Sequence, residues 1–99
     1  MIIDIQYVQM PTSESMSAFI TEKLEKLASK YDWLIRAEVF LKLENDKSGK
    51  SKVCEIQLSA PGPRLFAKAT DVQFDKAAIK TIKELEKQLS KRKETFNHH

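Results

Sequence analysis

Two stretches between residues 35 and 58 alternate between apolar and polar side chains, and this pattern constrains the fold more than any other feature of the chain. Alternation with a period of two predicts strands with one buried face. In the first stretch, the residues expected to face inward are Ile35, Ala37, Val39, Leu41 and Leu43. In the second, Cys54, Ile56 and Leu58 are expected inward, and Val53, Glu55 and Gln57 outward. Residues 45–50 have a turn composition, so these two strands are predicted to pair in antiparallel fashion.

Two further strands are predicted, one before and one after this pair. Residues 1–8 alternate loosely, with Ile3, Ile5 and Tyr7 on one face. The Pro-Gly-Pro sequence of residues 61–63 ends the strand that contains Cys54. A short fourth strand is expected over residues 64–69, and Thr70 and Asp71 are candidate caps for the helix that follows.

Two amphipathic helices complete the predicted elements. Ser13 is a favourable N-cap for a first helix of about 18 residues, whose apolar face consists of Met16, Ile20, Leu24, Leu27 and Tyr31. A second helix is expected to extend to about residue 95, with an apolar face formed by Phe74, Ala78, Ile82, Leu85 and Leu89. Because each helix has only one apolar face, both are expected to cover the same side of a sheet.

The order β-α-β-β-β-α therefore predicts an α+β fold, a two-layer sandwich with both helices packed on one face of a four-stranded sheet. The other face is expected to be solvated, which suits polar side chains such as Arg36, Glu38 and Lys42. The 99 residues contain no linker or internal repeat and fit one domain, with residues 1–95 as its core and 96–99 as a tail.

Composition argues against several classes of protein. No apolar run approaches the length of a membrane span, and Asp4 within the first apolar residues indicates a strand rather than a signal peptide. Cys54 is the only cysteine, which excludes an intrachain disulfide and suits a reducing cytosol; it is expected to be a buried structural thiol. With His98 and His99 it has no metal-ligand spacing. No catalytic constellation is visible, so the sequence predicts neither an enzyme nor a cofactor.

The net charge is concentrated on the last helix. Residues 73–94 carry seven basic and four acidic residues, so this segment accounts for the whole net charge of +3. Five of its lysines fall within about 80° of one helix face, opposite the apolar one; they are Lys76, Lys80, Lys83, Lys87 and Lys91. The first helix adds Lys23, Lys26 and Lys30 along one border of its apolar face. If the helices pack side by side, the two rows would flank a groove suited to an RNA backbone.

Other readings of these residues stay open. Lysines opposite an apolar face are also common on ordinary surface helices, and Glu84 and Glu86 neutralise part of the row. Arg64 and Lys68 either extend the basic surface or protect an edge strand from aggregation. An aromatic residue, Trp33, follows the end of the first helix together with Tyr31, and the two are expected to cover that end rather than stack on bases.

Short motifs along nearly the whole chain resemble the family of ribosome hibernation-promoting factors and ribosome-associated inhibitors. They are Ile3-Asp4-Ile5, Ser13-Glu14-Ser15-Met16, Lys23-Leu24-Glu25-Lys26-Leu27, Ala37-Glu38-Val39-Phe40-Leu41, and Leu85-Glu86-Lys87-Gln88-Leu89 followed by Lys91 and Lys93. The chain departs from the family pattern at Glu84, where a lysine is common, and at Lys87, which replaces an arginine.

The resemblance implies a fold like that of double-stranded-RNA-binding domains and a function without catalysis. It implies binding to 16S-type rRNA of the small ribosomal subunit at the decoding region, in the channel used by mRNA and by A- and P-site tRNA. Binding would block initiation and store ribosomes in stationary phase or stress. Long members of the family carry a second domain that dimerises ribosomes, so this chain resembles the short form and is expected to be cytoplasmic and monomeric when free.

The cations that would contact rRNA come from both helices and from the strand before the second helix. They are Lys23, Lys26, Lys30, Arg64, Lys68, Lys76, Lys80, Lys83, Lys87, Lys91, Arg92 and Lys93. Two alternatives remain: a generic double-stranded-RNA-binding module that acts away from ribosomes, and a protein-interaction domain whose lysines dock an acidic partner.

Overall fold

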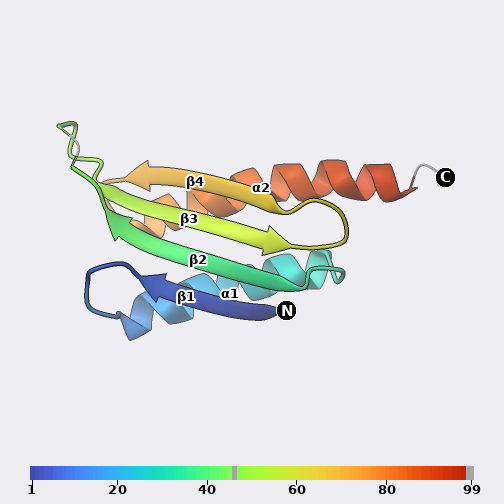
Figure 1. Ribbon diagram of the computed structural model, residues 1–99, viewed down its shortest axis with the longest axis horizontal. Helices are drawn as coiled ribbons and strands as arrows, with labels where there is room; N and C mark the ends of the chain where they lie inside the picture. The colour runs from blue at the N-terminus through green and yellow to red at the C-terminus, as the bar shows by residue number, and fades with distance from the viewer. Residues whose placement is uncertain (46, 98–99) are drawn as a thin grey trace.

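The computed structural model describes residues 1–45 and 47–97 and contains the six predicted elements in the predicted order (Figure 1). They are β1 (Ile2–Tyr7), α1 (Glu14–Lys30), β2 (Arg36–Leu43), β3 (Lys52–Ser59), β4 (Leu65–Asp71) and α2 (Phe74–Asn97). Asp46 in the predicted β2–β3 turn, and His98 and His99 in the predicted tail, lie outside the described residues.

The four strands form one mixed sheet in the order β1-β2-β3-β4. β2 pairs with β3 and β3 with β4 in antiparallel fashion, as predicted, whereas β1 runs parallel to β2. A parallel neighbour requires a crossover connection, and α1 provides it. Both helices lie on the same face of the sheet, α1 behind β1 and β2 and α2 behind β3 and β4 in the view of Figure 1. The predicted two-layer α+β architecture is therefore confirmed.

The start of α1 is fixed by the predicted cap. The Ser13 hydroxyl accepts a hydrogen bond from the Met16 amide at 3.3 Å, and so satisfies an amide that lacks a partner within the helix. The Tyr7 hydroxyl, at the end of β1, donates to the Ser13 carbonyl at 2.7 Å. These bonds tie the end of the first strand to the start of the crossover helix.

The core lies between the sheet and the two helices. Val39, Ile56 and Leu58 are buried on the inner face of the sheet, as the alternation predicted. Leu24 from α1 and Leu85 from α2 are buried in the same cluster. The other fully buried core residues include Ile20, Ala37, Leu41, Cys54, Ala77, Ala78 and Leu89.

Cys54 is buried, as predicted, and is joined to α2 through its backbone. The Thr81 hydroxyl lies 3.1 Å from the Cys54 carbonyl and 2.8 Å from the Ala77 carbonyl, so both oxygens can accept from it. Burial raises the pKa of the Cys54 thiol to about 11, although a hydrogen bond with Thr81 lowers it in part. The side chain therefore stays a neutral thiol and packs as a small apolar group.

The alternation misplaced three side chains. Ile35 and Leu43 were expected to face the core, but 56% and 57% of their surfaces are exposed. Ile35 lies just before β2, and Leu43 is the last residue of that strand. Val53 was expected to be solvated and is fully buried, although it lies on the face of the sheet opposite the helices. Its cross-strand neighbours there are Lys42 and Thr70, which flank it on both sides.

Thr70 and Asp71 are not helix caps, which corrects the prediction. The ladder between β3 and β4 continues to the Lys52–Asp71 pair, so both residues belong to the strand. The Asp71 carboxylate instead accepts from the Val72 amide at 2.6 Å and pairs with Lys80 at 2.6 Å. Asp71 therefore fixes the connection between β4 and α2 from the strand side.

Candidate nucleic-acid interface

The two helices pack against each other and leave a groove that carries lysines from both. One hollow of about 230 Å³ is lined by Lys23, Lys26, Leu27, Lys30, Ile82 and Glu86. A neighbouring hollow of about 220 Å³ is lined by Lys23, Ile79, Ile82 and Lys83. We refer to these eight residues as the interhelical groove. It has an aliphatic floor and a basic rim, a combination that suits the sugar–phosphate backbone of a nucleic acid.

The three α1 lysines of the groove differ in how far they are already engaged. The ammonium of Lys30 donates to Glu86 on α2 at 2.9 Å, and this hydrogen bond raises the pKa of Lys30. The ammonium of Lys26 lies 3.4 Å from Glu22, one turn earlier on α1. The Lys23 ammonium lies 5.4 Å from the centre of the Phe19 ring. All three ammonium groups lie beside the groove.

On α2 the basic surface continues from the groove along the outer face of the helix. Lys83, Lys87 and Lys91 are exposed and border a broad, open depression that Tyr31, Glu84 and Glu86 also line. We call these three residues the outer lysine row. In the part of the chain that the structure describes, none of the three forms an ion pair. Their ammonium groups are therefore available to an external anion.

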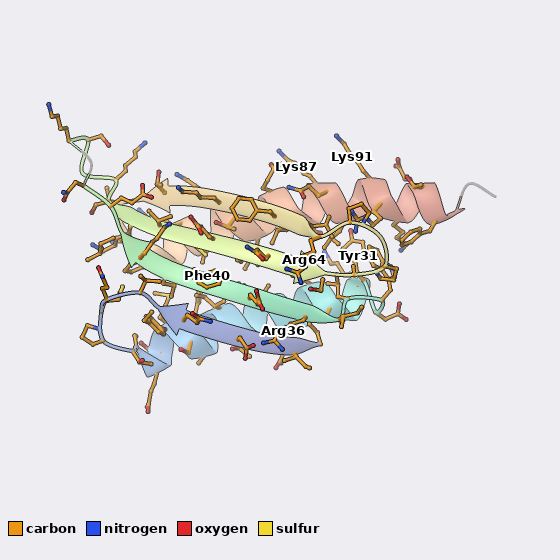
Figure 2. The ribbon with its side chains drawn as sticks, in the orientation of Figure 1. Tyr31, Arg36, Phe40, Arg64, Lys87 and Lys91 are labelled. Carbon is orange, nitrogen blue, oxygen red and sulfur yellow. The ribbon has the colours of Figure 1, made fainter. Side chains whose placement is uncertain are left out.

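Only part of the outer lysine row faces α1. Figure 2 shows Lys87 and Lys91 projecting from α2 past the β4 edge of the sheet, away from α1. Lys83 is the member of the row that also lines the groove. The expectation that both predicted rows flank one groove is thus met by Lys83 and the three α1 lysines, whereas Lys87 and Lys91 project to a second side of α2.

The two lysines nearest the start of α2 differ in whether they have a carboxylate partner. Lys76 is exposed. The Lys80 ammonium lies 2.6 Å from the Asp71 carboxylate, where the hydrogen bonds from Lys80 and from the Val72 amide lower the pKa of Asp71. Lys80 thus has a carboxylate partner within the fold and is less available to an external anion than Lys83.

At the end of α2 the basic residues contact neighbouring segments. Arg92 donates to the Pro61 carbonyl at 3.4 Å and so lies against the β3–β4 connection. The Lys93 ammonium lies 5.9 Å from the centre of the Tyr31 ring. Trp33 packs edge-on against Tyr31 and Phe96, with ring centres 5.8 and 5.1 Å apart. These contacts confirm that the aromatic residues cover the end of α1.

Arg64 and Lys68 lie apart from the helix lysines. Lys68 pairs with Glu44 at 3.2 Å and with Glu55 at 3.7 Å on the face of the sheet that the helices leave open. In Figure 2, where the helices are behind the sheet, Arg64 is drawn in front of the strands. The interpretation in which these two residues extend the helical surface is therefore wrong. Lys68 faces away from the helices because a strand directs alternate side chains to opposite faces, and Arg64 lies just before that strand.

Sequence reasoning missed the position of Glu86. The sequence predicts only that it neutralises part of the lysine row, yet it lines the groove and contacts Lys30 across it. The sequence holds a weak signal, since Glu86 follows Ile82 by one helical turn and so shares the flank of α2 that borders its apolar face. Only the packing of α2 on α1 shows which lysine that carboxylate meets.

Other kinds of site find no support in the residues described. Within 1–45 and 47–97, no group of three or more histidine, cysteine or acidic side chains is arranged to hold a metal ion. Across the same residues, neither helix combines the length and the apolar character needed to cross a membrane.

Comparisons with known proteins agree with this architecture. The family model described as sigma 54 modulation protein / S30EA ribosomal protein matches residues 3–97. A ribosomal subunit interface protein from Coxiella burnetii superposes with a TM-score of 0.84 at 20% identity, covering 94% of this chain and 98% of that one. The N-terminal domain of Protein Y from Thermus thermophilus gives 0.77 at 24% identity, covering 92% and 98%. A search of curated proteins found no match. At these identities the structural likeness establishes the fold.

Proposed function

The chain belongs to the sigma 54 modulation protein / S30EA ribosomal protein family, whose model covers residues 3–97, and from this membership we propose that it is a ribosome-associated factor that modulates translation. The finer proposal is that it binds the small subunit at the decoding region and keeps ribosomes inactive. It acts in the cytoplasm by occupying the path of mRNA and of A- and P-site tRNA, not by catalysing a reaction.

The observation that carries this proposal is the unequal distribution of charge on the helix layer. Lys83, Lys87 and Lys91 are exposed, Lys23 is partly exposed, and none of the four has a carboxylate partner among the described residues. Lys83 joins the two regions, because it lines the interhelical groove beside Lys23 and the depression that Lys87 and Lys91 border. Such ammonium groups neutralise phosphates and fix the orientation of the protein without reading bases. Structured RNA would therefore be recognised by its shape.

The remaining helix cations contribute to different extents. Lys26 and Lys30 border the groove, and their carboxylate partners are exposed enough to be exchanged for phosphate. Lys76 and Lys93 extend the surface at the two ends of α2. Arg92 and Lys80 contribute less because they hold contacts within the fold.

Sedimentation with purified small subunits tests the proposal directly. We expect the protein to sediment with small subunits in a sucrose gradient and to be displaced by tRNA. If about five phosphates are engaged, the logarithm of the affinity should fall with the logarithm of salt concentration with a slope on the order of −4, using the coefficient for duplex DNA.

Three results would contradict it. A flat salt response would show that phosphates are not the ligand. Equal affinity for free duplex RNA and for small subunits would favour a generic double-stranded-RNA-binding module. Complexes that contain no ribosomes and survive ribonuclease would favour docking to an acidic protein.

A further inference from the structure

Glu86 has an unusual position for a carboxylate on a surface expected to bind polyanions. Among the described residues that line the two hollows of the interhelical groove, it is the one acidic side chain, and five apolar or basic residues surround it in the larger hollow. Its Oε1 atom accepts from the Lys30 ammonium at 2.9 Å, a contact that bridges the groove from α2 to α1. Any phosphate that enters beside Lys30 therefore meets a negative charge already bound there.

A role in stability does not account for this pair. The Lys30 and Glu86 side chains are 62% and 42% exposed, and exposed ion pairs contribute little to folding stability because water and salt screen them. The helices are held together by the buried core below the groove, which includes Leu27 and Leu85. The carboxylate is thus free to act on ligands without being required for the fold.

We propose that Glu86 is an intramolecular competitor of RNA phosphate, which occupies Lys30 in the free protein and lowers the affinity of the interhelical groove for polyanions. The inference rests on the proposed function and adds a regulatory residue to the same surface. Binding RNA beside Lys30 exchanges one carboxylate contact for one phosphate contact, so this lysine adds little net affinity. A factor that stores ribosomes must also leave them, and a weakened groove keeps its binding reversible.

The matched variants are Glu86→Gln and Glu25→Gln, which remove the same charge from different places. Glu25 is exposed on α1 and does not line either hollow. At about 0.1 M salt we expect Glu86→Gln to bind small subunits roughly three- to tenfold more tightly than the unchanged protein, and Glu25→Gln to differ less than about twofold. The salt slope of Glu86→Gln should steepen by about 0.9, as expected for one additional phosphate contact.

A double-mutant cycle with Lys30→Gln identifies the lysine through which Glu86 acts. Lys30→Gln alone should weaken binding only slightly, because Lys30 is already neutralised. In the Glu86→Gln background the same change should remove at least half of the gain. An unchanged affinity of Glu86→Gln, an equal gain from Glu25→Gln, or a gain that persists in full without Lys30 would each overturn the inference.

Elution from immobilised heparin separates this inference from the proposed function. Heparin is a polyanion without ribosomal shape, and Glu86→Gln should elute from it at higher salt than Glu25→Gln. If this shift occurs while the unchanged protein fails to sediment with small subunits, the competitor role stands and the proposed function falls. If the unchanged protein sediments but the shift is absent on both ligands, the proposed function stands and the competitor role falls.

Discussion

The outer surface of the helix layer and the open face of the sheet both carry basic side chains, but they differ in how many of these cations pair with carboxylates. On the open face, Arg36 pairs with Asp4 and lies 3.3 Å from Glu38, and Lys42 lies 2.8 Å from Glu55. Lys68 shares Glu55 with Lys42. On the helix layer, the outer lysine row has no such partners among the described residues.

The difference follows from the geometry of the two kinds of element. Neighbouring strands bring side chains of separate segments within reach of one another, so cations and carboxylates on one face can alternate and cancel. On a helix, residues three and four apart share a face, so lysines with this spacing gather on one side. Glu84 and Glu86 line the same depression, but neither pairs with a lysine of the outer row. The number of cations on a face therefore says less about polyanion binding than the contacts that those cations already make.

The largest expected effect comes from removing three charges from one surface or the other. We expect Lys83→Gln, Lys87→Gln and Lys91→Gln together to weaken small-subunit binding by about 100-fold, or about 2.7 kcal/mol, because three phosphate contacts are lost. Arg36→Gln, Lys42→Gln and Lys68→Gln remove the same charge from the open face and should change binding by less than about threefold. Affinities measured at one salt concentration provide the comparison. Equal losses would mean that only net charge matters and would remove the distinction between the surfaces.

A smaller effect is expected within the open face itself, on stability. Val53 is fully buried there, whereas Phe66 is 49% exposed. Val53→Ala should lower the free energy of unfolding by about 2 kcal/mol, since it removes buried methyl groups from a packed position. Phe66→Ala should cost less than about 1 kcal/mol although it removes more atoms. Urea unfolding of both variants measures the two losses in unfolding free energy. A larger loss for Phe66→Ala would show that the exposed ring stabilises the open face more than the buried valine does.

The smallest effect concerns Lys80, which lies on α2 but has a carboxylate partner like the cations of the sheet. The hydrogen bonds from Lys80 and the Val72 amide lower the pKa of Asp71 below its ordinary value of 3.8. A lowered pKa in the folded state stabilises the fold fully above the unfolded value, and this stabilisation is lost as pH falls through the folded value.

Asp71→Asn should therefore be less stable than the unchanged protein at about pH 5, with the difference shrinking as the pH approaches about 2. Urea unfolding at a series of pH values measures the difference in unfolding free energy between Asp71→Asn and the unchanged protein. If the difference in unfolding free energy stays constant over this range, the Asp71 charge does not contribute to stability. The control is Asp75→Asn, which lies at an exposed hydrogen bond in the first turn of α2.

Much of the fold could be predicted because its signals are local. The alternation around Val39 and Ile56, the Ser13 cap and the Pro-Gly-Pro break all describe single segments, and the structure confirms each of them. Apart from Val53, which is buried on the open face, the errors lie at the ends of strands. Ile35 and Leu43 fit the period of the strand, but one lies just before β2 and the other is its last residue, and both are more than half exposed.

The candidate site was less accessible to prediction. Helical spacing identified the lysines of α2, but it could not show that Lys80 meets Asp71, that Lys30 meets Glu86, or that Lys68 lies on the far face with Glu55. Their roles in RNA binding stay predictions. Each of these contacts joins residues of different elements, so no periodicity within one element reports it.

The sequence by itself determined which segments become helices and strands, which side of each is apolar, and that the excess positive charge lies on the last helix. The tertiary structure alone decided which of the cations remain available. The physical reason is that backbone periodicity assigns a side chain to a face of its own element, whereas an ion pair forms only when strand register and helix packing bring two faces to within a few ångströms of each other.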